Sequence, residues 1–65
     1  MITVNGKPVN DAVGLNVTEL LTREDYPTKM IAVECNGEII SRANYENYRF
    51  KDGDCIEVVR FVGGG

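Results

Sequence analysis

Short runs of alternating apolar and polar residues open the chain and predict β-strands. Residues 1–4 and 7–10 flank Asn5-Gly6, a pair that favours a hairpin turn because both central positions of a type I′ turn need positive φ. Pro8 cannot donate a ladder hydrogen bond, so we expect the second strand to lie at a sheet edge. The sequence therefore predicts an N-terminal β-hairpin.

The spacing of apolar residues then changes to that of a helix. Asn16 is a good N-cap, and Glu19 stands at the third helical position, where it completes a capping box. We predict a helix over residues 17–23 that ends before Tyr26-Pro27, since the residue before proline avoids helical geometry. A helix of about seven residues is not stable alone. It must therefore cover one face of the sheet.

The second half of the chain returns to short apolar runs separated by turns. The predicted elements are a central strand at 30–35, a turn at Asn36-Gly37, a strand at 38–40, a short 3₁₀ or α turn from Ser41 with Tyr45 or Tyr48 packed back, a turn at 51–54 and a last strand at 55–62.

Alternation assigns faces to these strands. Glu34 and Glu57 are expected to face water, which turns Cys35 inward and Cys55 outward, so the two thiols should not form a disulfide. The residues expected to lose most solvent are apolar and lie on the inward faces: Ile2, Val4, Val17, Leu20, Leu21, Ile31, Val33, Ile56 and Val58.

Composition narrows the classes of function. The 65 residues carry a net charge of −3 with no basic cluster, which argues against nucleic acid and anionic membranes as partners. The sequence contains no histidine, so it has no imidazole base and no histidine metal ligand, and we expect no metal site. It also contains no phosphate-loop motif and no nucleophile elbow. We interpret the chain as a substrate or a binding module rather than an enzyme. With no signal peptide or membrane span visible, a cytoplasmic location is expected.

The last strand runs directly into three glycines, Gly63, Gly64 and Gly65. Three glycines lose much backbone entropy on ordering and have no side chain to pack. We therefore divide the chain into a folded domain at 1–62 and a flexible tail at 63–65 that presents a carboxylate on a narrow tether. The alternative interpretation is an inert, frayed terminus.

With this order of elements and this tail, the chain resembles the ThiS family of ubiquitin-like sulfur carriers. The resemblance covers essentially the whole chain and rests on the Asn5-Gly6 hairpin, the capped helix with Val17-x-x-Leu20-Leu21, the segment Ala32-Val33-x-x-Asn36-Gly37-Glu38-Ile39-Ile40 with Ser41-Arg42-x-x-Tyr45, the segment Asp52-Gly53-Asp54-x-Ile56, and the glycine end. It implies an α+β fold of the β-grasp class, with a mixed sheet of four to five strands on one short helix. The third glycine, Gly63, departs from the diglycine that the family requires.

The resemblance also implies a function for Gly65. In the family, an E1-like adenylating enzyme uses ATP to activate the C-terminal glycine carboxylate, a persulfide enzyme supplies sulfur, and the resulting thiocarboxylate gives sulfur to thiazole synthase for the thiazole ring of thiamine. The carrier itself binds no cofactor. Three alternatives stay open: a molybdopterin synthase small subunit, a ubiquitin-like protein modifier, and an interaction module with an inert tail.

The residues before the tail are candidates for partner binding, together with Gly63 and Gly64. If Ile56 and Val58 face the core, Val59 and Phe61 share the opposite face with Glu57 and form an exposed apolar patch. Such a patch suits docking. Arg60, on the other face, is expected to add a charge at the rim.

Overall fold

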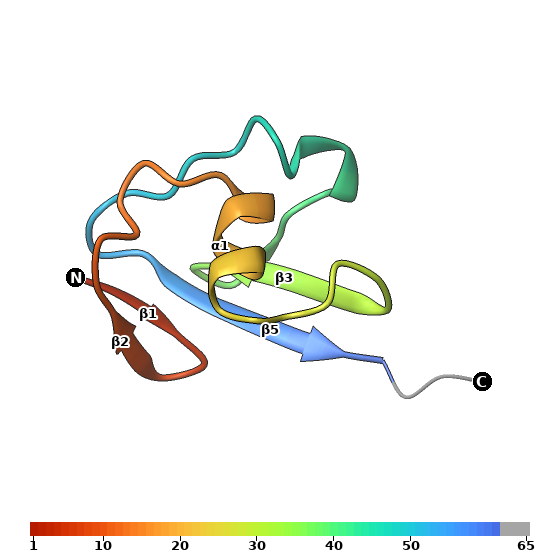
Figure 1. The fold of residues 1–65 in the computed structure, drawn as a ribbon, viewed down its shortest axis with the longest axis horizontal. Coiled ribbons are helices and arrows are strands. Elements are labelled where there is room, and N and C mark those ends of the chain that lie inside the picture. Colours follow the sequence, from red (N-terminus) through yellow and green to blue (C-terminus); the bar gives the residue numbers. More distant parts are fainter. Residues whose placement is uncertain (62–65) are drawn as a thin grey trace.

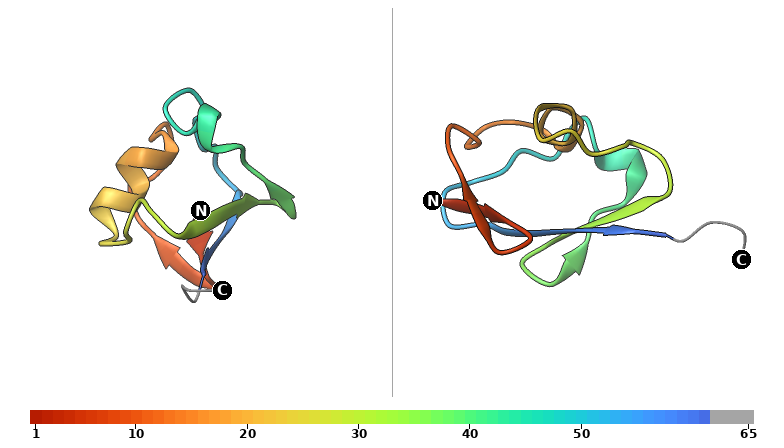
Figure 2. Two further views of the ribbon diagram at one scale, coloured as in Figure 1. Left: turned by 90° about the vertical axis from the view of Figure 1, so that its right-hand side faces the viewer. Right: turned by 60° about the horizontal axis from the view of Figure 1, so that its bottom comes forward.

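The structure is a computed structural model that describes residues 1–61, and it contains one mixed sheet and one short helix (Figure 1). The elements follow in the order β1 (Ile2–Val4), β2 (Lys7–Val9), α1 (Val17–Arg23), β3 (Ile31–Cys35), β4 (Glu38–Ile39), the 3₁₀ helix η1 (Arg42–Asn44) and β5 (Cys55–Arg60). The five strands lie in the order β2-β1-β5-β3-β4. Helix α1 covers one face of the sheet (Figure 2); we call the other face the open face.

The N-terminal hairpin is confirmed. Strands β1 and β2 pair antiparallel, and Asn5 and Gly6 in the turn have φ values of 51° and 82°. Strand β2 lies at the edge of the sheet, where Pro8 has no second strand to hydrogen-bond.

The strand predicted to be central, β3, has a neighbouring strand on each side but is not the middle strand of the five. β3 lies inside the sheet, but the middle position belongs to β5, which pairs parallel with β1 and antiparallel with β3. A run of apolar residues indicates that one face of a strand is buried, and both β3 and β5 contain such a run. The same pattern does not indicate how many strands lie on each side of a given strand.

Strand ends also differ by one or two residues from the predicted ones, in part because Met30 has a φ of 60° and leaves the extended conformation. The predicted extension of the last strand to residue 62 lies outside the described residues, as does the predicted tail at 63–65.

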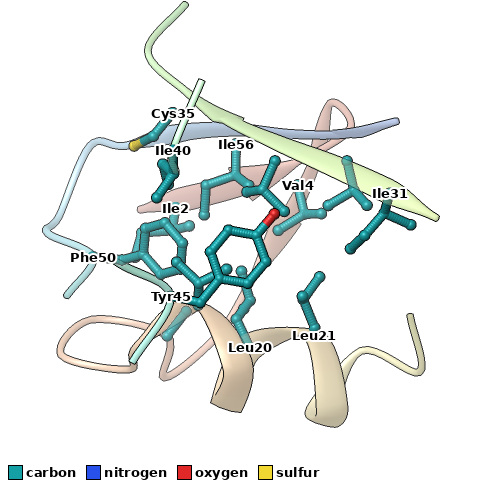
Figure 3. Packing of buried hydrophobic residues seen from close by; sticks show 14 residues of the cluster. Ile2, Val4, Leu20, Leu21, Ile31, Cys35, Ile40, Tyr45, Phe50 and Ile56 are labelled. Atoms are coloured by element: carbon teal, nitrogen blue, oxygen red, sulfur yellow. The ribbon is translucent and has the colours of Figure 1, made fainter. Parts of the chain in front are cut away.

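Helix α1 begins and ends where predicted, and its capping box is complete. The Asn16 side-chain oxygen accepts a hydrogen bond from the Glu19 amide at 2.8 Å, and the Asn16 amide donates to the Glu19 carboxylate at 2.9 Å. The helix buries Val17, Leu20 and Leu21 against the sheet (Figure 3). Among the described residues, no helix combines the length and apolarity needed to cross a membrane.

All nine predicted core residues are buried, and the core contains five more: Ala12, Cys35, Ile40, Tyr45 and Phe50. Cys35 was expected to point inward, and Tyr45 was one of two tyrosines expected to pack back. Phe50, only 1% exposed, had no periodic signal. Its backbone amide donates to the Leu15 carbonyl at 3.0 Å, and its carbonyl accepts from the Gly14 amide at 2.8 Å. These bonds connect two irregular segments and turn the Phe50 ring into the core (Figure 3).

Candidate functional site

Strand β5 leads toward the glycine tail and is held on both sides. Its first residues pair with β1 through Thr3 and Val4, and its residues 56–60 pair with β3, from Cys35–Ile56 to Ile31–Arg60. Beyond the strand, the Phe61 amide still donates to the Met30 carbonyl at 2.8 Å. The segment before the tail is thus fixed in direction by the middle of the sheet, and it ends at the tip of the molecule toward the C-terminus (Figure 1).

Asn5 extends the support of β5 beyond the end of β1. Its backbone amide donates to the Ile56 carbonyl at 2.8 Å. Its side-chain oxygen accepts from the Val58 amide, also at 2.8 Å, and its side-chain nitrogen donates to the Tyr26 hydroxyl at 2.9 Å. The turn residue therefore takes the position that a longer β1 would have occupied. Only its turn-forming role was predicted from the sequence.

The second turn residue, Asn36, fixes the start of β5. Its side-chain oxygen accepts from the Cys55 amide at 2.9 Å, and its side-chain nitrogen donates to the Asp54 carboxylate at 3.0 Å. The Lys51 amide donates to the same carboxylate at 2.8 Å. Burial alone raises the pKa of Asp54, but the Lys51 and Asn36 donors outweigh that effect and leave this pKa below its ordinary value. Asp54 is thus a buried, hydrogen-bonded carboxylate at the base of the strand.

The predicted apolar patch is exposed where it was expected. Val59 is 45% exposed and Phe61 is 53% exposed, whereas Ile56 and Val58 are buried. Val59 lies opposite Ala32 of β3 on the open face. Met30, which accepts the Phe61 hydrogen bond, is also exposed.

Arg60 is exposed and lies opposite the buried Ile31, so it alternates with Val59 and Phe61 as predicted. Gly63, Gly64 and Gly65 lie outside the described residues. The structure therefore confirms the exposure of Val59 and Phe61 and the alternation of Arg60 with them. The role of these residues in docking stays a prediction.

The open face carries a feature that the sequence analysis missed. Glu34 of β3 and Glu57 of β5 lie directly opposite each other, and Ile39 of β4 lies opposite Glu34 on its other side. Alternation predicted that both glutamates face water. Their pairing depends on the register between two strands more than twenty residues apart, for which the sequence holds no local signal.

The two cysteines lie on opposite faces, as predicted, and both are free. Cys35 is buried, and burial raises the pKa of its thiol. Interaction with Cys35, with a smaller effect of burial, raises the pKa of Tyr48 to about 12. Cys55 is exposed on the open face beside Glu57.

Two shallow pockets lie away from the patch. One, of about 210 Å³, is lined by residues that include Cys35, Ile40 and Tyr48; the other, of about 330 Å³, is lined by residues that include Thr18, Arg42 and Tyr45. Neither has a lining residue from β5. Within residues 1–61, no three histidine, cysteine or acidic side chains gather as a metal site. Near the segment that leads to the tail, the open face presents exposed apolar and acidic side chains, a combination that suits protein docking.

The sequence and the fold of this chain are similar to those of known proteins. The family model described as "ThiS family" matches residues 2–65. The sulfur carrier protein ThiS of Bacillus subtilis is 38% identical over 66 residues, which cover all of both chains. A crystal structure of a thiamine biosynthesis protein (ThiS) from Geobacter metallireducens superposes with a TM-score of 0.80 at 43% identity, over 98% of this chain and 97% of that one. This match confirms the predicted β-grasp fold.

Longer proteins also contain a similar segment. A protein named thiazole synthase from Paramagnetospirillum magneticum is 34% identical over 64 residues, and one from Magnetococcus marinus is 38% identical over 64 residues. In both comparisons the chain spans 20% of the length of the relative. The match at full length to the B. subtilis protein, together with the family model over residues 2–65, shows that this chain belongs to the ThiS family.

Proposed function

We propose that the chain is a sulfur carrier of thiamine biosynthesis and that its reactive group is the Gly65 carboxylate. The observation that carries the proposal is the family match over residues 2–65, because it includes the three glycines. The fold supports it as well, since β5, the last strand before those glycines in the sequence, is fixed in the middle of the sheet. The match favours thiamine biosynthesis over the molybdopterin pathway and protein modification.

The carboxylate needs activation before it can accept sulfur. It is ionised at neutral pH, with an α-carboxyl pKa of ~3.3–3.7, and is a poor electrophile. Attack of a carboxylate oxygen on the α-phosphorus of ATP releases pyrophosphate and forms an acyl-adenylate. An E1-like partner enzyme performs this step, so the carrier supplies a substrate group and acts as a co-substrate.

Sulfur then enters from a persulfide. The terminal sulfur of a partner's cysteine persulfide attacks the acyl carbon, AMP leaves, and the carrier and the partner are joined through an acyl disulfide. A thiolate attacks the partner's sulfur, which releases the thiocarboxylate and leaves a disulfide between the two thiols. The carrier thiocarboxylate finally gives its sulfur to thiazole synthase. The two longer relatives named thiazole synthase support this last partnership, because each holds a ThiS-like segment within one polypeptide.

In this proposal the body of the carrier serves to dock. Val59 and Phe61 contact the partner enzyme beside the mouth of its channel, Arg60 lies at the rim, and Gly63 and Gly64 pass through the channel, where a Cβ would restrict φ and occupy space. The exposure of an aromatic side chain two residues before the first glycine supports this arrangement.

Intact-mass spectrometry tests the proposal. The chain is co-expressed with the E1-like enzyme and a cysteine persulfide donor, purified and weighed. We expect a species heavier by the mass difference between sulfur and oxygen, and we expect iodoacetamide to alkylate that species at its C-terminus. A chain deleted at Gly65 is the control. An unmodified mass for the full chain, with an active partner enzyme in the same sample, would contradict the proposal.

A further inference from the structure

The middle of the open face holds two carboxylates side by side. Glu34 and Glu57 are directly opposed on antiparallel strands, and such pairs have Cβ atoms roughly 4.5–5.5 Å apart. Like charges at this position destabilise a sheet. The pair therefore lowers the stability of the free folded protein, unless another group neutralises the two charges.

Within residues 1–61, neither carboxylate forms a salt bridge or a side-chain hydrogen bond. The salt bridges of this region involve Asp52, Glu24 and Glu19, and no side-chain hydrogen bond reaches Glu34 or Glu57. Arg60 alternates to the opposite side of β5. Glu34 is half-buried and Glu57 is exposed, so both carboxylates are accessible from the open face.

Apolar side chains lie on two sides of this pair. Ile39, 71% exposed, lies opposite Glu34 on the β4 side, and Val59 follows Glu57 by two residues along the same face of β5. Phe61 continues that row toward the tail. The open face thus has an acidic centre with apolar flanks, and it lies next to the segment that leads to Gly65.

We infer that this face docks the adenylating partner through an arginine whose guanidinium group lies between Glu34 and Glu57, with apolar partner side chains on Val59, Phe61 and Ile39. The inference rests on the proposed function and adds the chemistry of the partner surface. A guanidinium group suits the pair because its planar fork presents five donors and can hydrogen-bond two carboxylates at once. The ammonium group of lysine is a strongly hydrated point charge and fits the pair less well.

The same charges disfavour other occupants of the open face. In a face-to-face dimer of this chain, each protomer would bring two further carboxylates to the interface. An anionic membrane would repel the pair as well. A basic, partly apolar protein surface complements both features of the face. The adenylating enzyme is the partner to test, because it must bind the carrier before any other group is attached.

The experiment is calorimetric titration of the purified carrier into the purified adenylating enzyme of the same organism. We expect Glu34→Gln and Glu57→Gln each to weaken binding roughly 10-fold, as for one hydrogen bond to a charged group. Because one arginine serves both carboxylates, the double variant should be only about 10–30-fold weaker, not the product of the two single effects. Raising NaCl should weaken binding of the wild type more than that of the double variant.

Thermal melting separates docking from folding. Each glutamine variant should melt at the same or a higher temperature than the wild type, because the like-charge contact is removed. Glu38→Gln is the matched control. Glu38 lies opposite Cys35 and so points to the other side of the sheet, and its loss should leave affinity unchanged.

Two outcomes would overturn the inference. In the first, the double variant binds with unchanged affinity while Phe61→Ala still weakens binding. That result would show that no arginine binds the two glutamates, although the face still docks the partner. A wild-type dimer in sedimentation experiments that is lost in Phe61→Ala would assign the face to a second copy. Failure of the proposed function is distinguishable from both, since it appears as an unmodified intact mass of the wild-type chain.

Discussion

The side-chain oxygen of Asn5 accepts a hydrogen bond from the backbone amide of Val58, at 2.8 Å and across 53 positions of the sequence. Strand β1 ends at Val4, so this amide group has no strand partner on the β1 side of β5. The Asn5 side chain replaces that partner. One residue thus forms the first hairpin turn and also holds the strand that leads to the tail.

We predict that Asn5→Gly destabilises the protein by about 1–2 kcal/mol, since glycine accepts the positive φ but cannot bond Val58. Asn5→Ala should cost about 1 kcal/mol more, because a Cβ-bearing residue without a polar side chain disfavours a φ of 51°. Urea unfolding measures both values. Hydrogen exchange should show faster opening at the Val58 amide in either variant. Equal stability of wild type and Asn5→Gly would mean that water replaces the side chain without cost.

The apolar patch should matter for binding and not for folding. Phe61→Ala is expected to weaken binding to the adenylating enzyme and to thiazole synthase by ~1–3 kcal/mol, as is typical of an aromatic residue at the centre of an interface. Its melting temperature should be unchanged, because the Phe61 side chain is 53% exposed. Val13→Ala is a suitable control, since Val13 is 61% exposed in a loop. Calorimetric titration against each enzyme makes the measurement, and equal affinity of Phe61→Ala and wild type for both would place docking elsewhere.

Asp54 should make stability depend on pH in the acid range. Its pKa in the folded protein is lowered, because donors from Lys51 and Asn36 outweigh its burial. A group with a lowered folded pKa stabilises the protein above its unfolded pKa of about 3.9, and that stability is lost as pH falls through the folded pKa.

Asp54→Asn tests this prediction. The variant should be less stable than the wild type at pH 7. The difference between the two should shrink as the pH falls below about 3.9, where the unfolded wild-type carboxyl becomes protonated, and then through the lower pKa of the folded state. Urea unfolding at a series of pH values gives the comparison. If the difference in unfolding free energy between variant and wild type stays constant from pH 7 down to pH 2, the stability loss comes from altered packing and not from the lost charge.

The tail should be required for chemistry alone. Deletion of Gly65, or replacement of Gly64 by a bulky residue, is expected to abolish ATP–pyrophosphate exchange with the adenylating enzyme. The melting temperature should stay the same, because the last strand of the sheet ends at Arg60. Gly63→Ala separates the third glycine from the diglycine and should retain most of the exchange. Near-normal exchange by the chain that lacks Gly65 would rule out the carboxylate as the reactive group.

The sequence by itself determined the local elements and the faces of the strands. The capping box of Asn16 and Glu19, the Asn5-Gly6 turn and the opposite orientations of Cys35 and Cys55 depend on residues a few positions apart, so short-range patterns predicted them. The same alternation predicted that Val59 and Phe61 are exposed.

Only the tertiary structure decided how these elements meet. The position of β5 between β1 and β3, the burial of Phe50 and the opposition of Glu34 and Glu57 depend on the register between distant segments. Each strand specifies which of its faces is buried, because alternation has a period of two residues. The choice of neighbouring strand and of register depends on how all the buried faces pack together, and the sequence of a single segment does not specify that packing.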